Sequence, residues 1–148
     1  MPRILVLHGP NLDALGTREP ETYGRETLDD IDRDLRTLAR ELHCEIECQQ
    51  SAHEGVLIES LYRARGTCDG VLLNPGGLTH TSVALRDAVL GSGLPVIEVH
   101  VTNPHRREEF RRRSLVSDVC IAVIQGFGSD SYRLALRGLA ARLDRGQG

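Results

Sequence analysis

Short apolar runs alternate along the chain with longer segments in which apolar residues recur every three or four positions. The short runs predict buried strands, and the longer periodic segments predict amphipathic helices. The predicted strands cover residues 3–8, 44–49, 70–73, 95–101 and 119–125. The predicted helices run from Leu28 to Leu42, over 54–65, 81–90 and 103–113, and along the apolar series from Tyr132 to Leu143.

The helical segments carry two more specific signals. Thr27 and Asp30 have the spacing of an N-terminal capping box for the helix that begins at Leu28. Tyr132 lies within the closing helical pattern and is expected to be a core residue. The side chains expected to face the core from the segment 54–65 are Val56, Leu57, Leu61 and Tyr62.

This alternation of strand and helix predicts a parallel sheet that is covered by helices on both faces. The expected fold is α/β, a flavodoxin-like three-layer sandwich whose five-stranded parallel sheet has the order 2-1-3-4-5. With 148 residues, the chain is expected to form a single domain over 1–148 with a loose tail at 145–148.

Residues 8–24 show neither helical nor strand periodicity. A structureless connection of this length is uncommon in a compact domain and is typical of a lid or binding loop. It carries Asn11, Arg18 and Tyr23, which could meet a ligand together. A tyrosine with its ordinary pKa of about 10 is a poor base at neutral pH, but a nearby guanidinium stabilises the phenolate. The alternative is that the tyrosine and the arginine only pack together.

Polar residues gather where the predicted strands end, which in a doubly wound sheet is the edge that binds ligands. The run from Asn74 through Gly76 and Gly77 would let the backbone approach a ligand and then start a helix whose N–H groups point at it. An ordinary turn with a helix cap explains this run equally well. With the expected strand order, Asn11 and Asn74 would face each other across the crevice.

Glu98 and His100 are two positions apart on a predicted strand and therefore share a face. A carboxylate beside an imidazole raises its pKa and fixes its tautomer, which suits a general acid or base. The alternative is a surface charge pair. Arg107 and Arg111 are four positions apart and could fix a substrate carboxylate, or they could be part of a solvated helix face.

Composition narrows the possible functions. All 18 basic residues are arginine, so the chain has no lysine for Schiff-base chemistry or for a Walker-type phosphate loop. The net charge of −3 gives no reason to expect a nucleic-acid partner. No apolar run is long enough for a membrane span, and no signal segment is visible, so a cytoplasmic protein is expected. The four cysteines have poor spacing for zinc and are expected to be buried free thiols rather than metal ligands.

Together these motifs resemble the type II 3-dehydroquinate dehydratase family over nearly the whole chain. They follow one another in the order expected of that family. The stretches that carry the resemblance are 9–12, 15–20, 23–24, 50–51, 53–55, 74–76, 79–88, 97–100, 103–105, 107–108 and 110–111.

The resemblance implies an anti elimination of water from 3-dehydroquinate to give 3-dehydroshikimate through an enolate, in the shikimate or the quinate pathway. It implies neither a metal nor a cofactor. Tyr23 would remove the proton next to the ketone, and Arg18 would hold Tyr23 as phenolate. Asn11 would help to stabilise the enolate. His100, oriented by Glu98, would protonate the departing hydroxyl.

The resemblance also implies how the substrate is bound. Arg107 would position the loop and the ligand, and Asp87 would reach the site of a neighbouring subunit. The usual assembly of the family is a dodecamer made of four trimers. The groups expected to contact substrate belong to Asn74, Gly76, Gly77, His80, Val101, Thr102 and Arg111.

The chain departs from the family pattern at Ala52, Leu78 and Thr102, where Asn, Tyr and Ser are frequent. None of these changes removes a catalytic role. They do leave open the alternative that the chain is a related lyase or hydratase that acts on another polyhydroxy acid. A non-catalytic flavodoxin-like binding module is a further alternative, and it would require the tyrosine and arginine of the loop to be incidental.

Overall fold

All five predicted strands form, and they pair in parallel in the order β2-β1-β3-β4-β5, which confirms the expected topology. The structure is a computed structural model that describes residues 1–146; residues 147 and 148, the end of the predicted tail, lie outside the described residues. The strands are β1 (Arg3–His8), β2 (Glu45–Gln50), β3 (Gly70–Asn74), β4 (Val96–His100) and β5 (Ala122–Gln125).

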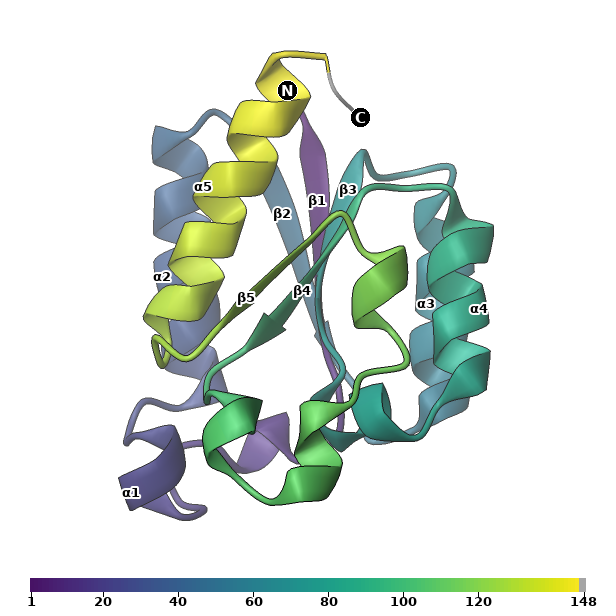
Figure 1. Ribbon diagram of the computed structural model, residues 1–148. Coiled ribbons are helices and arrows are strands. Elements are labelled where there is room, and N and C mark those ends of the chain that lie inside the picture. The colour runs from purple at the N-terminus through teal and green to yellow at the C-terminus, as the bar shows by residue number, and fades with distance from the viewer. Residues whose placement is uncertain (147–148) are drawn as a thin grey trace.

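Helices cover both faces of this sheet and make it the middle layer of three (Figure 1). Helices α2 (Leu28–Glu41) and α5 (Asp130–Asp144) lie on one face, and α3 (Glu54–Ala64) and α4 (Val83–Ser92) lie on the other. Successive side chains of a strand point to opposite faces, so Ile4 and Val6 join the core under α2 and α5 while Leu5 and Leu7 join the core under α3 and α4. No helix within residues 1–146 is long and apolar enough to cross a membrane.

The predicted capping box of α2 is present and fixes the far end of the 8–24 connection. The Asp30 backbone N–H donates to Thr27 Oγ1 at 3.1 Å, and the Thr27 backbone N–H donates to the Asp30 carboxylate at 3.0 Å. A box of this kind satisfies N–H groups that the first turn of a helix leaves without partners. The chain therefore leaves the connection and enters α2 at a defined position.

The prediction that α3 buries four apolar side chains is wrong for two of them. Leu57 and Leu61 are fully buried, but Val56 and Tyr62 are each 43% exposed in this chain. Tyr62 lies across the seam between α3 and α4, where its hydroxyl packs so closely against Gly91 that a Cβ at that position would clash with it. The helix thus buries a narrower stripe than its apolar spacing suggested. Tyr132 is fully buried, as predicted.

The predicted helix at 103–113 is not continuous. Two short 3₁₀ turns, Pro104–Arg106 and Glu109–Arg112, are separated by extended backbone at Arg107 and Glu108. The extended geometry turns the Arg107 side chain toward the loop at 8–24, which a regular helix would not do. The helix predicted at 81–90 begins at Val83, after a 3₁₀ turn over Gly76–His80.

Candidate active site

The connection at 8–24 is attached to the end of β3 by a close backbone contact. The Gly9 N–H donates to the Asn74 carbonyl at 2.8 Å, and a Cβ on Gly9 would lie 2.8 Å from the Pro75 carbonyl oxygen. Only glycine allows the two backbones to approach this closely. The connection then forms a 3₁₀ turn over Leu12–Ala14 and the short helix α1 (Pro20–Tyr23).

A cavity of about 180 Å³ lies between this connection and the carboxyl ends of β3 and β4. It unites every residue predicted for the site except Glu98 and Asp87. Asn11 and Asn74 line the same cavity, as the expected strand order required. The predicted residues that line it are Asn11, Arg18, Tyr23, Asn74, Gly76, Gly77, His80, His100, Val101, Thr102, Arg107 and Arg111.

Glu98 lies directly behind His100 on β4. His100 Nε2 donates a hydrogen bond to the buried Glu98 carboxylate, which leaves Nδ1 as the nitrogen free for a ligand. Two hydroxyls, Thr79 Oγ1 at 2.6 Å and Ser117 Oγ at 2.5 Å, also donate to the carboxylate. Neither Thr79 nor Ser117 is among the site residues predicted from the sequence, because contacts between segments this far apart leave no local pattern.

Burial on its own raises the pKa of Glu98, but the hydrogen bond and charge of His100, with the Ser117 and Thr79 hydroxyls, outweigh it. The pKa of Glu98 therefore lies below its ordinary value of 4.5. A carboxyl whose pKa is lowered by folding stabilises the native state above its unfolded pKa, and this contribution is lost as the pH falls through the folded pKa.

We therefore expect the free energy of unfolding to decrease below about pH 4.5, and to decrease less steeply in Glu98→Gln, which has no carboxyl at this position. Chemical denaturation of both proteins between about pH 3 and 6 measures the two slopes. Equal slopes would show that Glu98 gives no such acid dependence.

Tyr23 lies between two guanidinium groups that contact it differently. Arg107 donates from a terminal nitrogen to the Tyr23 hydroxyl oxygen at 2.6 Å. The Arg18 guanidinium lies over the ring, 4.6 Å from its centroid. The first contact is a charge-assisted hydrogen bond to the oxygen, and the second is a cation–π contact with the ring face. The arginine on the tyrosine oxygen is thus Arg107, and the predicted role of Arg18 in holding the phenolate stays a prediction.

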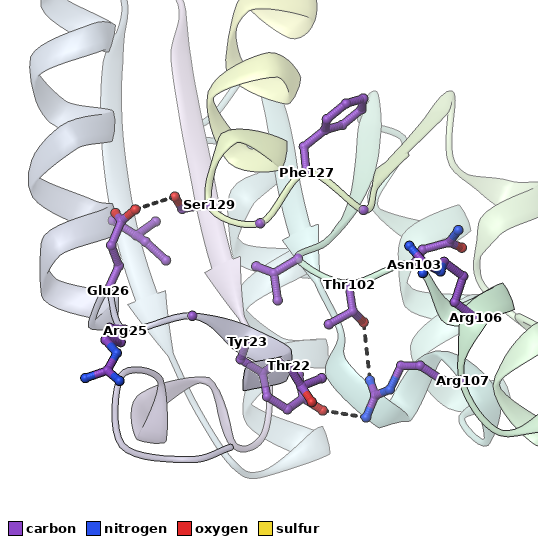
Figure 2. A pocket seen from close by; sticks show the side chains of 15 residues that line it. Thr22, Tyr23, Arg25, Glu26, Thr102, Asn103, Arg106, Arg107, Phe127 and Ser129 are labelled. Atoms are coloured by element: carbon purple, nitrogen blue, oxygen red, sulfur yellow. Dashed lines mark hydrogen bonds between the residues drawn. The ribbon is translucent and has the colours of Figure 1, made fainter. Parts of the chain in front are cut away.

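Tyr23 and Arg107 line both the small cavity and a larger one of about 610 Å³, whose lining Figure 2 shows. Figure 2 shows Arg107 extended between the Thr102 hydroxyl and the Tyr23 hydroxyl, with Phe127 and Ser129 farther along the wall. The larger cavity contains none of His80, His100 or Asn74. The smaller cavity is therefore the candidate active site, because the acid–base groups and the oxyanion donors meet there.

Asp87 does not reach this cavity within one chain. It is exposed on α4, outside the lining of the site. Its predicted contact with a neighbouring subunit stays a prediction.

No group of three or more His, Cys, Asp or Glu side chains within residues 1–146 is placed to hold a metal ion. All four cysteines are free: Cys44 and Cys68 are buried, and Cys48 and Cys120 are half-buried. Burial raises the pKa of the Cys48 and Cys120 thiols to about 12. These thiols are therefore protonated at neutral pH and unsuited to nucleophilic chemistry.

Known proteins resemble this chain along most of its length. The family model described as dehydroquinase class II matches residues 2–140. A 3-dehydroquinate dehydratase of Gloeobacter violaceus is 56% identical over 143 residues, which cover 97% of this chain and 89% of the relative. A catabolic 3-dehydroquinase 2 of Aspergillus flavus is 56% identical over 137 residues, which cover 93% of this chain and 91% of the relative.

A crystal structure of a type II dehydroquinase from Butyrivibrio crossotus superposes with a TM-score of 0.92 at 39% identity. The superposition covers 93% of this chain and 97% of that one. Sequence and fold therefore agree along almost the whole length, and this chain belongs to the class II dehydroquinase family.

Proposed function

We propose that this chain eliminates water in the anti sense from 3-dehydroquinate to give 3-dehydroshikimate. The observation that carries the proposal is the content of one small cavity, where a tyrosine held by a guanidinium, an asparagine and a carboxylate-backed histidine converge. Removing a proton beside a ketone and expelling a hydroxyl requires a base, a stabiliser of the enolate oxygen and an acid. Tyr23, Asn11 and His100 supply one of each.

The proton movements follow from the hydrogen bonds of these groups. Tyr23 as phenolate takes the proton from the carbon next to the ketone, and the electron pair moves to the ketone oxygen beside Asn11. The enolate then re-forms the ketone as the hydroxyl leaves from the neighbouring carbon. His100 enters this step as the imidazolium, gives that hydroxyl the proton on Nδ1 and releases it as water, while Nε2–H remains on Glu98. The proton that Tyr23 took then passes through solvent back to His100, which restores both groups for the next turnover.

The rest of the cavity suits a polyhydroxy carboxylate. Arg111, whose guanidinium also pairs with Glu108 at 3.0 Å, provides a cation for the carboxylate or a hydroxyl. The Asn74 and His80 side chains and the Thr102 hydroxyl provide further polar groups. Backbone around Gly76, Gly77, Val101 and Thr102 completes the lining.

The proposal extends to the setting of the enzyme. We propose a single domain over 1–148, a cytoplasmic location and a dodecamer of four trimers, in which the exposed Asp87 reaches a neighbour's cavity. Relatives include a 3-dehydroquinate dehydratase and a catabolic 3-dehydroquinase, so a role in either the shikimate or the quinate pathway fits.

The test is turnover of purified protein with 3-dehydroquinate, followed by the ultraviolet absorbance of the enone product. Because the chain has no lysine, we expect turnover to survive borohydride added together with substrate. Absence of turnover at every pH would overturn the proposed function. Inactivation by borohydride that depends on substrate would instead indicate an imine intermediate and contradict the enolate route.

A further inference from the structure

A chain of buried polar side chains runs behind Asn74, away from the substrate cavity. Asn74 Nδ2 lies 2.8 Å from the Tyr132 hydroxyl on α5, which lies 2.9 Å from His8 Nδ1 on β1. His8 Nε2 lies 2.8 Å from the Asp32 carboxylate on α2. His8 and Tyr132 are fully buried, and Asn74 is 2% exposed. Of these four groups, only Asn74 belongs to the cavity lining.

One backbone group determines which atom donates and which accepts in each hydrogen bond of this series of side chains. The Gly76 N–H can only donate, and it donates to Asn74 Oδ1 at 3.1 Å. The Asn74 amide nitrogen therefore faces Tyr132 and donates to its oxygen. The Tyr132 hydroxyl must then donate to His8 Nδ1, which leaves the imidazole proton on Nε2 for Asp32.

A doubly protonated His8 does not fit this arrangement. Its Nδ1–H would donate to the Tyr132 oxygen, which already accepts from Asn74. The buried Tyr132 hydroxyl proton would then lack an acceptor, and an unpaired buried polar group costs on the order of 1–3 kcal/mol. The neutral Nε2–H form gives each of the three hydrogen bonds between these side chains one donor and one acceptor.

We propose that Asp32, His8 and Tyr132 are positioning residues that hold the Asn74 amide in one orientation for substrate binding. These hydrogen bonds keep Asn74 Oδ1 on the Gly76 N–H and one amide N–H of Asn74 on the Tyr132 oxygen. The second amide N–H of Asn74 is therefore left for a substrate hydroxyl. This inference rests on the proposed function, because it assigns Asn74 to 3-dehydroquinate. A phenylalanine at position 132 would fill the same space in the core. The Tyr132 hydroxyl therefore contributes to the orientation of the Asn74 amide and not to core packing.

The first test is Tyr132→Phe, which removes only the hydroxyl. We expect KM for 3-dehydroquinate to rise about tenfold while kcat changes by less than about threefold, because Asn74 binds ground state and transition state alike. Adding Tyr132→Phe to Asn74→Ala should raise KM no further, since residues that act through one another are not additive.

Asp32 provides the conservative variant. Asp32→Asn keeps an oxygen for His8 Nε2–H and should leave KM close to that of the unchanged protein, whereas Asp32→Ala should raise it. Ser92→Ala is the matched control: it loses a buried hydrogen bond of 2.8 Å to the Val89 carbonyl at the opposite end of α4 from the site. It should lower thermal stability and leave KM unchanged.

Two results would overturn the proposal. One is a Tyr132→Phe protein that loses stability, as Ser92→Ala does, with an unchanged KM. The other is additive KM effects in the double variant. Nitrogen-15 NMR of the imidazole rings gives a readout that needs no activity: a His8 proton on Nδ1, or on both nitrogens, would contradict the hydrogen-bond chain. Absence of turnover in the unchanged protein would overturn the proposed function, whereas the NMR test of the hydrogen bonds at His8 would still apply.

Discussion

Replacing Tyr23 with phenylalanine is expected to lower kcat by about 10³-fold, within the range by which a positioned general base accelerates proton transfer. The phenol oxygen is the only group lost, and the ring that packs beneath Arg18 is kept. KM should therefore change little. Steady-state kinetics on 3-dehydroquinate measures both constants.

Arg107→Gln provides the matched comparison. Arg107 acts on the reaction through the Tyr23 oxygen, to which it donates at 2.6 Å. Once that oxygen is gone, loss of the guanidinium should have little further effect on kcat, so the double variant should be about as slow as Tyr23→Phe alone. A Tyr23→Phe protein with near-normal kcat would remove Tyr23 from the role of base. Independent losses in the double variant would show that Arg107 acts elsewhere.

The sheet could be predicted from the sequence because each strand is a short apolar run and each connection carries a helical period. Residues 3–8 form a strand with the predicted limits, and the order expected of a flavodoxin-like sheet is confirmed. Tyr62 shows the limit of the method. Helical spacing identifies which residues share a face, but the width of the stripe that is buried depends on how closely α3 and α4 pack.

Much of the candidate site could also be predicted from the sequence. The rule that parallel strands end at one edge predicts that Asn11, Asn74 and His100 lie together, and all three line one cavity. The contact of Arg107 with Tyr23 could not be predicted, because it joins residues 84 positions apart and depends on a break in an expected helix. The hydrogen bonds of the Tyr132 hydroxyl could not be predicted either. The helical spacing of Tyr132 marks its ring as a core residue but says nothing about its oxygen.

Replacing His100 with alanine is expected to lower kcat by about 10³-fold, because the departing hydroxyl then lacks its proton donor. This variant retains Tyr23, Arg107 and Asn11, so it can still form the enolate. In deuterium oxide it should therefore exchange the proton next to the ketone while forming almost no product, as mass spectrometry of the recovered 3-dehydroquinate would show. Tyr23→Phe should lose both exchange and product formation.

Comparison of His100→Ala with Tyr23→Phe separates enolate formation from loss of the hydroxyl. Glu98→Gln is the control for His100, because it keeps the imidazole and removes only the carboxylate that holds Nε2. Its product formation should fall less than that of His100→Ala, and its exchange should persist. If His100→Ala lost exchange as completely as Tyr23→Phe, His100 would be required for enolate formation, and its assignment as the acid of the second step would be wrong. Exchange without elimination in His100→Ala would show that enolate formation needs Tyr23 and not His100, and that loss of the hydroxyl needs His100.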